Sequence, residues 1–446
     1  MGPNDTNLET TRPHSPNSVA RSTAGTPGEG RSYETEKSEK APGLTLQQQN
    51  TARIQYVTLL WPMIVAGWND GTTGPLLPRI QEVYHVNFTI VSLIFVFACI
   101  GFVGGAIANM YMTPRFGFGK VIVFGAVCQA VAYAIQCSAP PFPVFVMAYT
   151  INGVGMALQD AQANGFVATL SSNAEAKMGV LHAFYGLGAF VSPLAATQFA
   201  QARRWSFHYL VSLSVSVVDI IVLVVVFKLK SMDECLALAG EHIPERAEEG
   251  EEGSFKQVMQ TRAVHLLAFF ILIYVGVEVT IGGWIVTFII DVRNGGPSSG
   301  YVSSGFFGGL TLGRVLLLWV NKKVGERLVL FIYATLAIAL DLTIWFVPSL
   351  IGNAVAISII GVLLGPMYPI AMNQTGRILP RWILTSSIGW IAGFGQAGSA
   401  VLPFMTGAIA EKHGIKTLQP LLVAMMAFMM FLWALVPRAP KVVRRP

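Results

Sequence analysis

Two carboxylates lie inside stretches of sequence that are otherwise apolar enough to cross a bilayer. Asp70 lies in the run that begins at residue 54, and Asp160 lies within the run 143–168. A charged side chain at the bilayer centre costs about 2.5–3.5 kcal/mol on insertion scales, so an intramembrane carboxylate marks a proton, ion or substrate pathway. The chemistry that these residues could perform is reversible proton binding, or hydrogen bonding to a polar solute.

Asp160 belongs to a polar patch on a predicted helix. Asn164 follows one helical turn later on the same face, and Gln159 lies on a flanking face. Burial in a low-dielectric cavity favours the neutral form of a carboxylate, so such a group can bind a proton at physiological pH. We expect Asp160 to couple proton entry to solute binding. The alternative is a structural carboxylate that is hydrogen-bonded to a neighbouring helix.

Three further ionisable or polar groups interrupt apolar runs. Asp70 follows Asn69, where Gly71, Gly74 and Pro75 weaken the helix, and irregular backbone at membrane depth survives only where it lines protein or a cavity. We expect Asp70 to contact substrate or protons, unless it lies at the outer water interface. Glu278 is predicted to bind substrate or to be a second coupling site. Arg314 is a counter-charge for one of these acids or a gate residue bonded to backbone carbonyls, and the sequence does not name its partner.

The composition is that of a protein that crosses the membrane many times. Hydrophobic residues make up 53% of the 446 residues and charged residues 12%, with a mean hydropathy of +0.55. A soluble globular chain carries about 25% charged residues. The net charge of +6 comes from basic residues that punctuate the apolar runs, so we expect a lipid bilayer and no nucleic acid as partner. We find no phosphate-binding glycine loop, HExxH or paired-cysteine motif, and expect no cofactor, metal or enzymatic activity.

Twelve stretches of about 20 mainly apolar residues are each long enough to span a bilayer. They are 54–77, 89–112, 119–138, 143–168, 178–200, 207–228, 263–290, 300–320, 326–347, 349–372, 383–409 and 417–437. The predicted domains are a disordered cytoplasmic tail (1–53), an amino-terminal six-helix bundle (54–228), a cytoplasmic central loop (229–262), a carboxy-terminal six-helix bundle (263–437) and a short cytoplasmic tail (438–446).

The two predicted bundles repeat one another. Gly-Phe-Val-Gly-Gly at 101–105 recurs as Gly-Phe-Phe-Gly-Gly at 305–309, and Gly-Leu-Gly at 186–188 recurs as Gly-Phe-Gly at 393–395. Parallel repeats place a substrate site at their interface, near the bilayer midplane. The distribution of basic residues between loops favours cytoplasmic termini at both ends. The plasma membrane and the vacuolar membrane both fit.

Several short motifs occur in these predicted spans. They are Trp68-Asn69-Asp70-Gly71, Asp160-Ala-Gln-Ala-Asn164-Gly-Phe166, Tyr274-Val-Gly276-Val-Glu278-Val279, Gly313-Arg314, Met367-Tyr368-Pro369 and Gly393-Phe-Gly395. With the duplication, these motifs make residues 54–437 resemble the major facilitator superfamily, and within it the fucose-permease-like proton symporters, including the fungal bypass-of-stop-codon-like members. The resemblance implies an all-α membrane protein of twelve transmembrane helices in two six-helix pseudo-repeats. It also implies a coupling carboxylate at Asp160.

The resemblance departs from the family pattern between the second and third predicted spans. An acidic residue normally follows the glycines there, but this chain has Asn109, and only Arg115, Gly117 and Lys120 match the pattern. We expect Arg115, Lys120 and Arg314 to be gating or ion-pair residues. Asp219 and Asp341 fall in helices that support the bundle in this superfamily, so we expect them to bond between helices or to snorkel.

Amides, carboxylates and aromatic rings in the predicted cavity-lining spans could bind a sugar, because sugars present both hydroxyls and apolar ring faces. The alternative for each aromatic residue alone is packing or a place in an interfacial belt. The predicted proton-coupling residues are Asp160, Asp70 and Glu278. The predicted substrate-binding residues are Asn69, Asp70, Gln159, Asp160, Asn164, Tyr185, Glu278, Trp284, Tyr368, Asn373, Trp390 and Gln396.

These observations predict a secondary-active transporter. We expect a monomeric proton symporter that moves a sugar or similar small polar solute by alternating access, with the solute and protons as its partners. Two alternatives remain open at this point: an uncoupled facilitator or exporter of organic solutes, and a non-transporting nutrient sensor that signals through its tail and central loop. Nucleosides, organic acids and amino acids also suit the polar residues.

Overall fold

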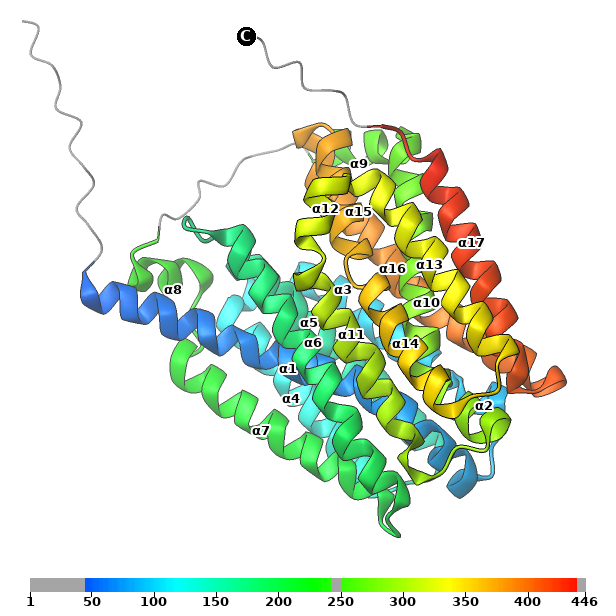
Figure 1. Cartoon of the computed structure of the whole chain (residues 1–446). Helices are drawn as coiled ribbons and strands as arrows, with labels where there is room; N and C mark the ends of the chain where they lie inside the picture. Colours follow the sequence, from blue (N-terminus) through cyan, green and yellow to red (C-terminus); the bar gives the residue numbers. More distant parts are fainter. Residues whose placement is uncertain (1–44, 242–250, 439–446) are drawn as a thin grey trace, which may run out of the picture. The chain divides into compact units, whose positions relative to one another are not determined.

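A computed structural model describes residues 45–241 and 251–438 of the chain, and its secondary structure within these ranges is helical (Figure 1). This confirms the predicted all-α class. Helices α1–α7 are called here the amino-terminal half, and helices α10–α17 are called the carboxy-terminal half. In Figure 1, α7 lies at one edge of this helical assembly and α17 lies at the opposite edge.

The amino-terminal half contains six long helices and two short ones. They are α1 (Leu46–Tyr84), α2 (Phe88–Val91), α3 (Leu93–Phe116), α4 (Phe118–Cys137), α5 (Phe142–Ala168), α6 (Ala174–Gln201), η1 (Trp205–Phe207) and α7 (His208–Phe227). The expected weak point in the first span is not a break, because α1 stays helical through Pro62, Pro75 and Pro78. The helix also begins at Leu46, earlier than the predicted end of the tail, and residues 1–44 lie outside the described residues.

The carboxy-terminal half follows the same plan with more interruptions. Its elements are α10 (Arg262–Arg293), η2 (Pro297–Gly300), α11 (Tyr301–Leu316), α12 (Leu318–Val324), α13 (Glu326–Phe346), α14 (Leu350–Leu364), α15 (Met367–Ile378), α16 (Arg381–His413), η3 (Ile415–Thr417) and α17 (Leu418–Leu435). Pro366 precedes α15, and its missing backbone donor is consistent with the break between α14 and α15. By contrast, α16 stays helical through Pro403.

Every predicted span falls on a helix, but the count of twelve spans is not confirmed. Among the described residues, nine helices are long and apolar enough to cross a membrane, and the bent pair α11–α12 raises the number to as many as ten. Helices α1 and α16 are not among them. Both carry polar residues of the predicted site, such as Asp70 on α1 and Gln396 on α16, which lower their hydropathy. The chain is therefore a multi-pass membrane protein whose least apolar helices are functional candidates.

The segment predicted as a central loop contains two short helices, α8 (Met232–Ala239) and α9 (Glu251–Gln260). A capping box begins α8, in which Ser231 and Glu234 each accept a hydrogen bond from the other's backbone N–H. Those bonds hold the pKa of Glu234 below its usual value. Gln55 Nε2 on α1 donates to the Cys235 carbonyl oxygen at 3.1 Å, so α8 is bound to the amino-terminal half. Residues 242–250, which include part of the acidic run, lie outside the described residues.

Glycines allow the same helix crossing in both halves. A Cβ atom at Gly153 on α5 would meet the backbone of α3 at Ala98 and Gly101. In the carboxy-terminal half, a Cβ atom at Gly361 on α14 would meet the backbone of α11 at Phe306 and Leu310. The glycine motifs that repeat in the sequence therefore lie at equivalent α3–α5 and α11–α14 contacts. Small residues at membrane helix interfaces let backbones approach closely.

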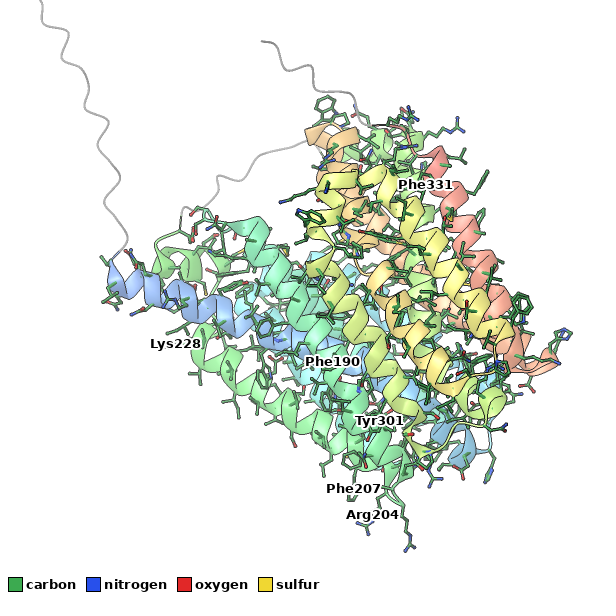
Figure 2. All side chains as sticks on the ribbon, viewed as in Figure 1. Phe190, Arg204, Phe207, Lys228, Tyr301 and Phe331 are labelled. Atoms are coloured by element: carbon green, nitrogen blue, oxygen red, sulfur yellow. The ribbon has the colours of Figure 1, made fainter. Side chains whose placement is uncertain are left out.

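The two halves meet along α1, α3 and α6 on one side and α10, α11 and α16 on the other. A Cβ atom at Gly74 would meet the Gly282 carbonyl oxygen, so α1 and α10 touch backbone to backbone. Figure 2 shows Phe190 of α6 and Tyr301 of α11 on the helices that join the halves, and Gln198 Nε2 on α6 donates to the Tyr301 hydroxyl. Phe190 packs against Gly308 of α11. Gly74, Gly282 and Gly308 thus allow the helices of the two halves to pack closely at the interface.

We predict that Gly153→Val destabilises the protein, by about 1–3 kcal/mol or more, because the new side chain would enter the backbone of α3. The measurement is thermal unfolding of the purified full chain in detergent. Gly104→Val is the matched control, since a Cβ atom at Gly104 meets nothing within 4 Å. Equal melting temperatures for the two variants would contradict the close α3–α5 crossing.

Candidate functional site

Asp70 lies at the tight contact between α1 and α6. Cβ atoms at Gly67 and Gly71, which flank Asp70, would meet the carbonyl oxygens of Tyr185 and Ala189 on α6. This approach brings the Tyr185 hydroxyl to the carboxylate, where it donates to Asp70 Oδ2 at 2.6 Å. A hydrogen bond between a hydroxyl and a charged carboxylate is short and strong, so Tyr185 fixes the orientation of Asp70.

Asn69 connects Asp70 to the interior of the amino-terminal half. Its Nδ2 donates to Asp70 Oδ1 at 3.1 Å. Its Oδ1 accepts from Asn152 Nδ2 on α5, and from the Tyr133 hydroxyl on α4 at 3.4 Å. Asn69 therefore orients Asp70, and its two other bonds leave its amide little freedom to bind a solute.

Arg314 on α11 pairs with Glu278 on α10. The distance from Arg314 Nη2 to Glu278 Oε1 is 3.9 Å, and the two side chains are 21% and 12% exposed. The Tyr274 hydroxyl, one helical turn before Glu278, interacts electrostatically with both charged groups and donates its hydrogen to the Leu364 carbonyl oxygen at 3.2 Å. The structure therefore supplies the partner of Arg314 that the sequence left open.

Asp160 keeps the local partner that the sequence predicts. Asn164 Nδ2 donates to Asp160 Oδ1 at 2.8 Å and to its carbonyl oxygen at 2.9 Å. Both residues are half-buried, whereas Gln159 next to them is buried. This contrast places the Asp160 face of α5 away from the interior of its own bundle.

These groups from both halves form one electrostatic cluster, called here the interface cluster: Asp70, Asp160, Tyr185, Glu278, Arg314 and Tyr368. Asp70 interacts with Glu278 across the two halves. Tyr185 interacts with Asp70, Glu278 and Arg314, and Tyr368 on α15 interacts with Asp160, Glu278 and Arg314. The cluster contains three carboxylates and one guanidinium. A proton bound to one carboxylate relieves the repulsion among the like charges.

Three predicted substrate ligands do not join the interface cluster. Gln159 is 2% exposed and bonds Asp219 inside the amino-terminal half, because it is rotated about 100° around α5 from Asp160. Trp284 is fully buried, and its Nε1 donates to the Pro403 carbonyl oxygen at 2.9 Å. Asn373 is exposed near the end of α15, where its Nδ2 donates to Glu326 Oε1 at 3.2 Å. The helical period turns Gln159 away from Asp160, and tertiary packing decides the orientations of Trp284 and Asn373.

The remaining predicted ligands lie on α16. The Trp390 ring packs against His265 and Phe394. Gln396 is half-buried, and its carbonyl oxygen accepts from Cys99 Sγ of α3 at 3.3 Å. Both residues therefore line the contact between α16 and its neighbours, and neither has a described hydrogen bond to the interface cluster.

The predicted gate residues Arg115 and Lys120 are exposed at the α3–α4 turn. Asn109 stands where the family pattern has an acid, and its Oδ1 accepts from Gln162 Nε2 of α5 at 2.6 Å and from Thr113 Oγ1 at 2.8 Å. A neutral amide network therefore ties α3 to α5 here.

The sequence analysis missed several residues that hold the cluster. Tyr274 lies four residues before Glu278, a spacing that places both on one helical face, so this signal was available. Tyr133 and Asn152, which bind Asn69, are brought to it by tertiary packing and carry no local signal. Glu326 and Arg377 form an ion pair at 2.9 Å between α13 and α15, and this pair was also missed.

Comparisons with known proteins agree with this architecture. Residues 62–362 match the model of the Major Facilitator Superfamily. The chain is 24% identical over 432 residues to Bypass of stop codon protein 6 of Saccharomyces cerevisiae, covering 91% of this chain and 86% of the relative. It is 22% identical over 343 residues to the glucose/mannose transporter of Bacillus subtilis, covering 75% and 83%. The crystal structure of a D-xylose–proton symporter has the same fold, with a TM-score of 0.72 at 11% identity over 87% of this chain and 98% of that one.

The family match covers more than half of the chain, and it agrees with the repeated glycine crossings and with the polar cluster between the two halves. This confirms the superfamily resemblance and identifies a transporter rather than an enzyme. The chain belongs to the Major Facilitator Superfamily.

Proposed function

We propose that this protein is a proton symporter that moves a sugar, or a chemically similar neutral solute, by alternating access. The observation that carries the proposal is the interface cluster, which combines three carboxylates from the two halves with one arginine, itself paired with Glu278. The similarity to a glucose/mannose transporter and to a D-xylose–proton symporter supports a sugar as the solute and a proton as the coupling ion.

The cluster suits a neutral solute better than an anionic one. Arg314 already pairs with Glu278, and Tyr274 interacts electrostatically with both. Tyr185 and Tyr368 offer hydroxyls and aromatic faces beside carboxylate acceptors, which are the groups that a sugar can use. Sugar hydroxyls would replace hydrogen bonds within the cluster, and a proton on Asp160 would offset its excess negative charge.

The contacts between the two halves support alternating access in this proposal. The solute would bridge Asp70 and Tyr185 of one half and Glu278 and Tyr368 of the other, so that its binding energy depends on how the halves are packed. The close approach of α1 to α10 at Gly74 and Gly282 would open when the halves rock. We further propose cytoplasmic termini, as the distribution of basic residues favours, and a monomer that resides in the plasma or vacuolar membrane.

We predict that Asp160→Asn abolishes uphill solute accumulation while leaving counterflow exchange, because an amide cannot release a proton. The solute would first be chosen by a thermal-shift panel of D-glucose, D-mannose, D-galactose, D-xylose and L-fucose on the purified protein. Accumulation and counterflow are then measured in proteoliposomes with an imposed proton gradient. Glu82→Gln is the control, because Glu82 pairs with Arg79 on an exposed part of α1.

Accumulation by Asp160→Asn at the level of Glu82→Gln would refute the coupling role of Asp160. Equal accumulation with and without the proton gradient would instead favour an uncoupled facilitator. Binding without any transport in the wild type would favour a sensor.

We predict that Glu278→Gln and Arg314→Gln each lower the melting temperature and solute affinity, since each leaves a charge without its partner. Removing one partner of a fully buried ion pair lowers the free energy of unfolding by about 3–5 kcal/mol. We expect a smaller decrease here because both side chains are partly exposed. The double variant should be more stable than the sum of the single losses predicts. Additive losses in thermal unfolding would show that the two charges do not interact.

A further inference from the structure

A second polar chain runs inside the amino-terminal half, behind the interface cluster. Asp219 on α7 is completely buried, and its Oδ2 accepts from Gln159 Nε2 of α5 at 2.6 Å. Gln159 Oε1 in turn accepts from Gln129 Nε2 of α4 at 2.6 Å. Helices α4, α5 and α7 therefore converge on the Asp219 carboxyl group, which has no role in the transport mechanism proposed above.

No cation in the described part of the chain compensates this carboxyl group. The ion pairs among residues 45–241 and 251–438 do not include Asp219, and its hydrogen-bond donor is a neutral amide. Its other oxygen, Oδ1, is buried and has no hydrogen-bond partner among the described residues. A buried charge without a partner is strongly disfavoured, and a carboxyl group in that position binds a proton instead. The unpartnered Oδ1 is where that proton would lie.

Tyr133 links this carboxyl group to the interface cluster. It interacts electrostatically with both Asp70 and Asp219, and its hydroxyl donates to Asn69 Oδ1 at 3.4 Å. Two buried acceptor oxygens nearby, Gln129 Oε1 and Asn152 Oδ1, also have no partner in the described part of the chain. Water molecules satisfy buried oxygens of this kind, and they would also conduct a proton.

The other helices that pack on α7 bring neutral groups toward it. The Trp61 indole of α1 donates to the Val215 carbonyl oxygen at 3.1 Å, one turn before Asp219. Tyr149 of α5 shares a hydrogen bond of 3.0 Å with Tyr209, nearly three turns before Asp219.

At the start of α7, near η1 and α6, His208 Nε2 lies 2.9 Å from Thr72 Oγ1 of α1, and Thr72 also bonds Ser192 of α6. Among the described residues, Tyr133 is therefore the titratable group that faces Asp219 from a neighbouring helix, and Tyr133 also interacts with Asp70.

We propose that Asp219 is a second proton-binding site, held inside the amino-terminal half and connected through Tyr133 and Asn69 to Asp70. A proton would pass reversibly between the two carboxyl groups along water and the Tyr133 hydroxyl, while Asn69 orients Asp70. Each oxygen on the path would release one proton as it accepts another, so that an O–H bond breaks on one aspartate and an O–H bond forms on the other. Its use in transport rests on the proposed symport, but the existence of the protonated carboxyl group does not.

Infrared spectroscopy of the full chain in lipid nanodiscs tests the site directly. The wild-type minus Asp219→Asn difference spectrum at neutral pH should contain one carbonyl band of a protonated carboxylic acid. Glu82→Gln, an exposed control, should leave that band in place. A difference spectrum that contains only the bands of an ionised carboxylate would overturn the proposal.

A second variant keeps the test valid if Asp219→Asn fails to fold. Gln159→Met retains Asp219 but removes the donor to Oδ2, so the same carbonyl band should shift in frequency. An unshifted band would mean that the band does not come from Asp219.

A transport measurement tests the connection. Tyr133→Phe removes the hydroxyl that reaches Asn69, and it should slow sugar-driven proton movement by a larger factor than it slows counterflow of the same sugar. Equal effects on both would indicate a structural role and overturn the connection. Because the infrared measurement involves no transport, its failure can be distinguished from a failure of the symport proposal.

Discussion

The interior of a membrane protein does not tolerate an ionised group without a partner, and this constraint organises the helices around the interface cluster. Arg314 meets Glu278 across the α10–α11 contact, and Asp70 receives hydrogen bonds from Tyr185 and Asn69. The guanidinium of Arg314 pairs with only one of the three carboxylates of the cluster, so the charge pairing is incomplete. Because this charge is not fully paired, binding of a proton or a polar solute between the two halves would stabilise the cluster.

Close helix crossings make this arrangement possible. Gly67 and Gly71 press α1 against α6, which sets the distance between Asp70 and Tyr185. Gly313 lets α11 lie against the backbone of α14 at Val362, and Arg314 follows it on the next position of the helix. These glycines therefore position the charged residues of the cluster. The repeated glycine motifs place the same kind of helix crossing in both halves.

The sequence was most informative where partners are close along one helix. The Asp160–Asn164 pair follows from their spacing of one turn, and the all-α class follows from long apolar runs. The partner of Arg314 was not predictable, because Glu278 lies on another helix and only packing brings the two together. Gln159 was assigned to the site because it adjoins Asp160, but adjacent helical residues point in different directions. The Ser231–Glu234 capping box could have revealed α8 within the predicted loop.

In the proposed mechanism, solute movement and proton movement are one process at the interface cluster. This coupling can be measured by recording the external pH of a lightly buffered suspension of proteoliposomes that contain the wild-type protein, while D-glucose or the best-bound sugar of the panel is added outside. We expect the outside to become more alkaline as sugar enters, and a proton-conducting ionophore to abolish the signal. Sugar uptake at full rate with no change in external pH would contradict this coupling.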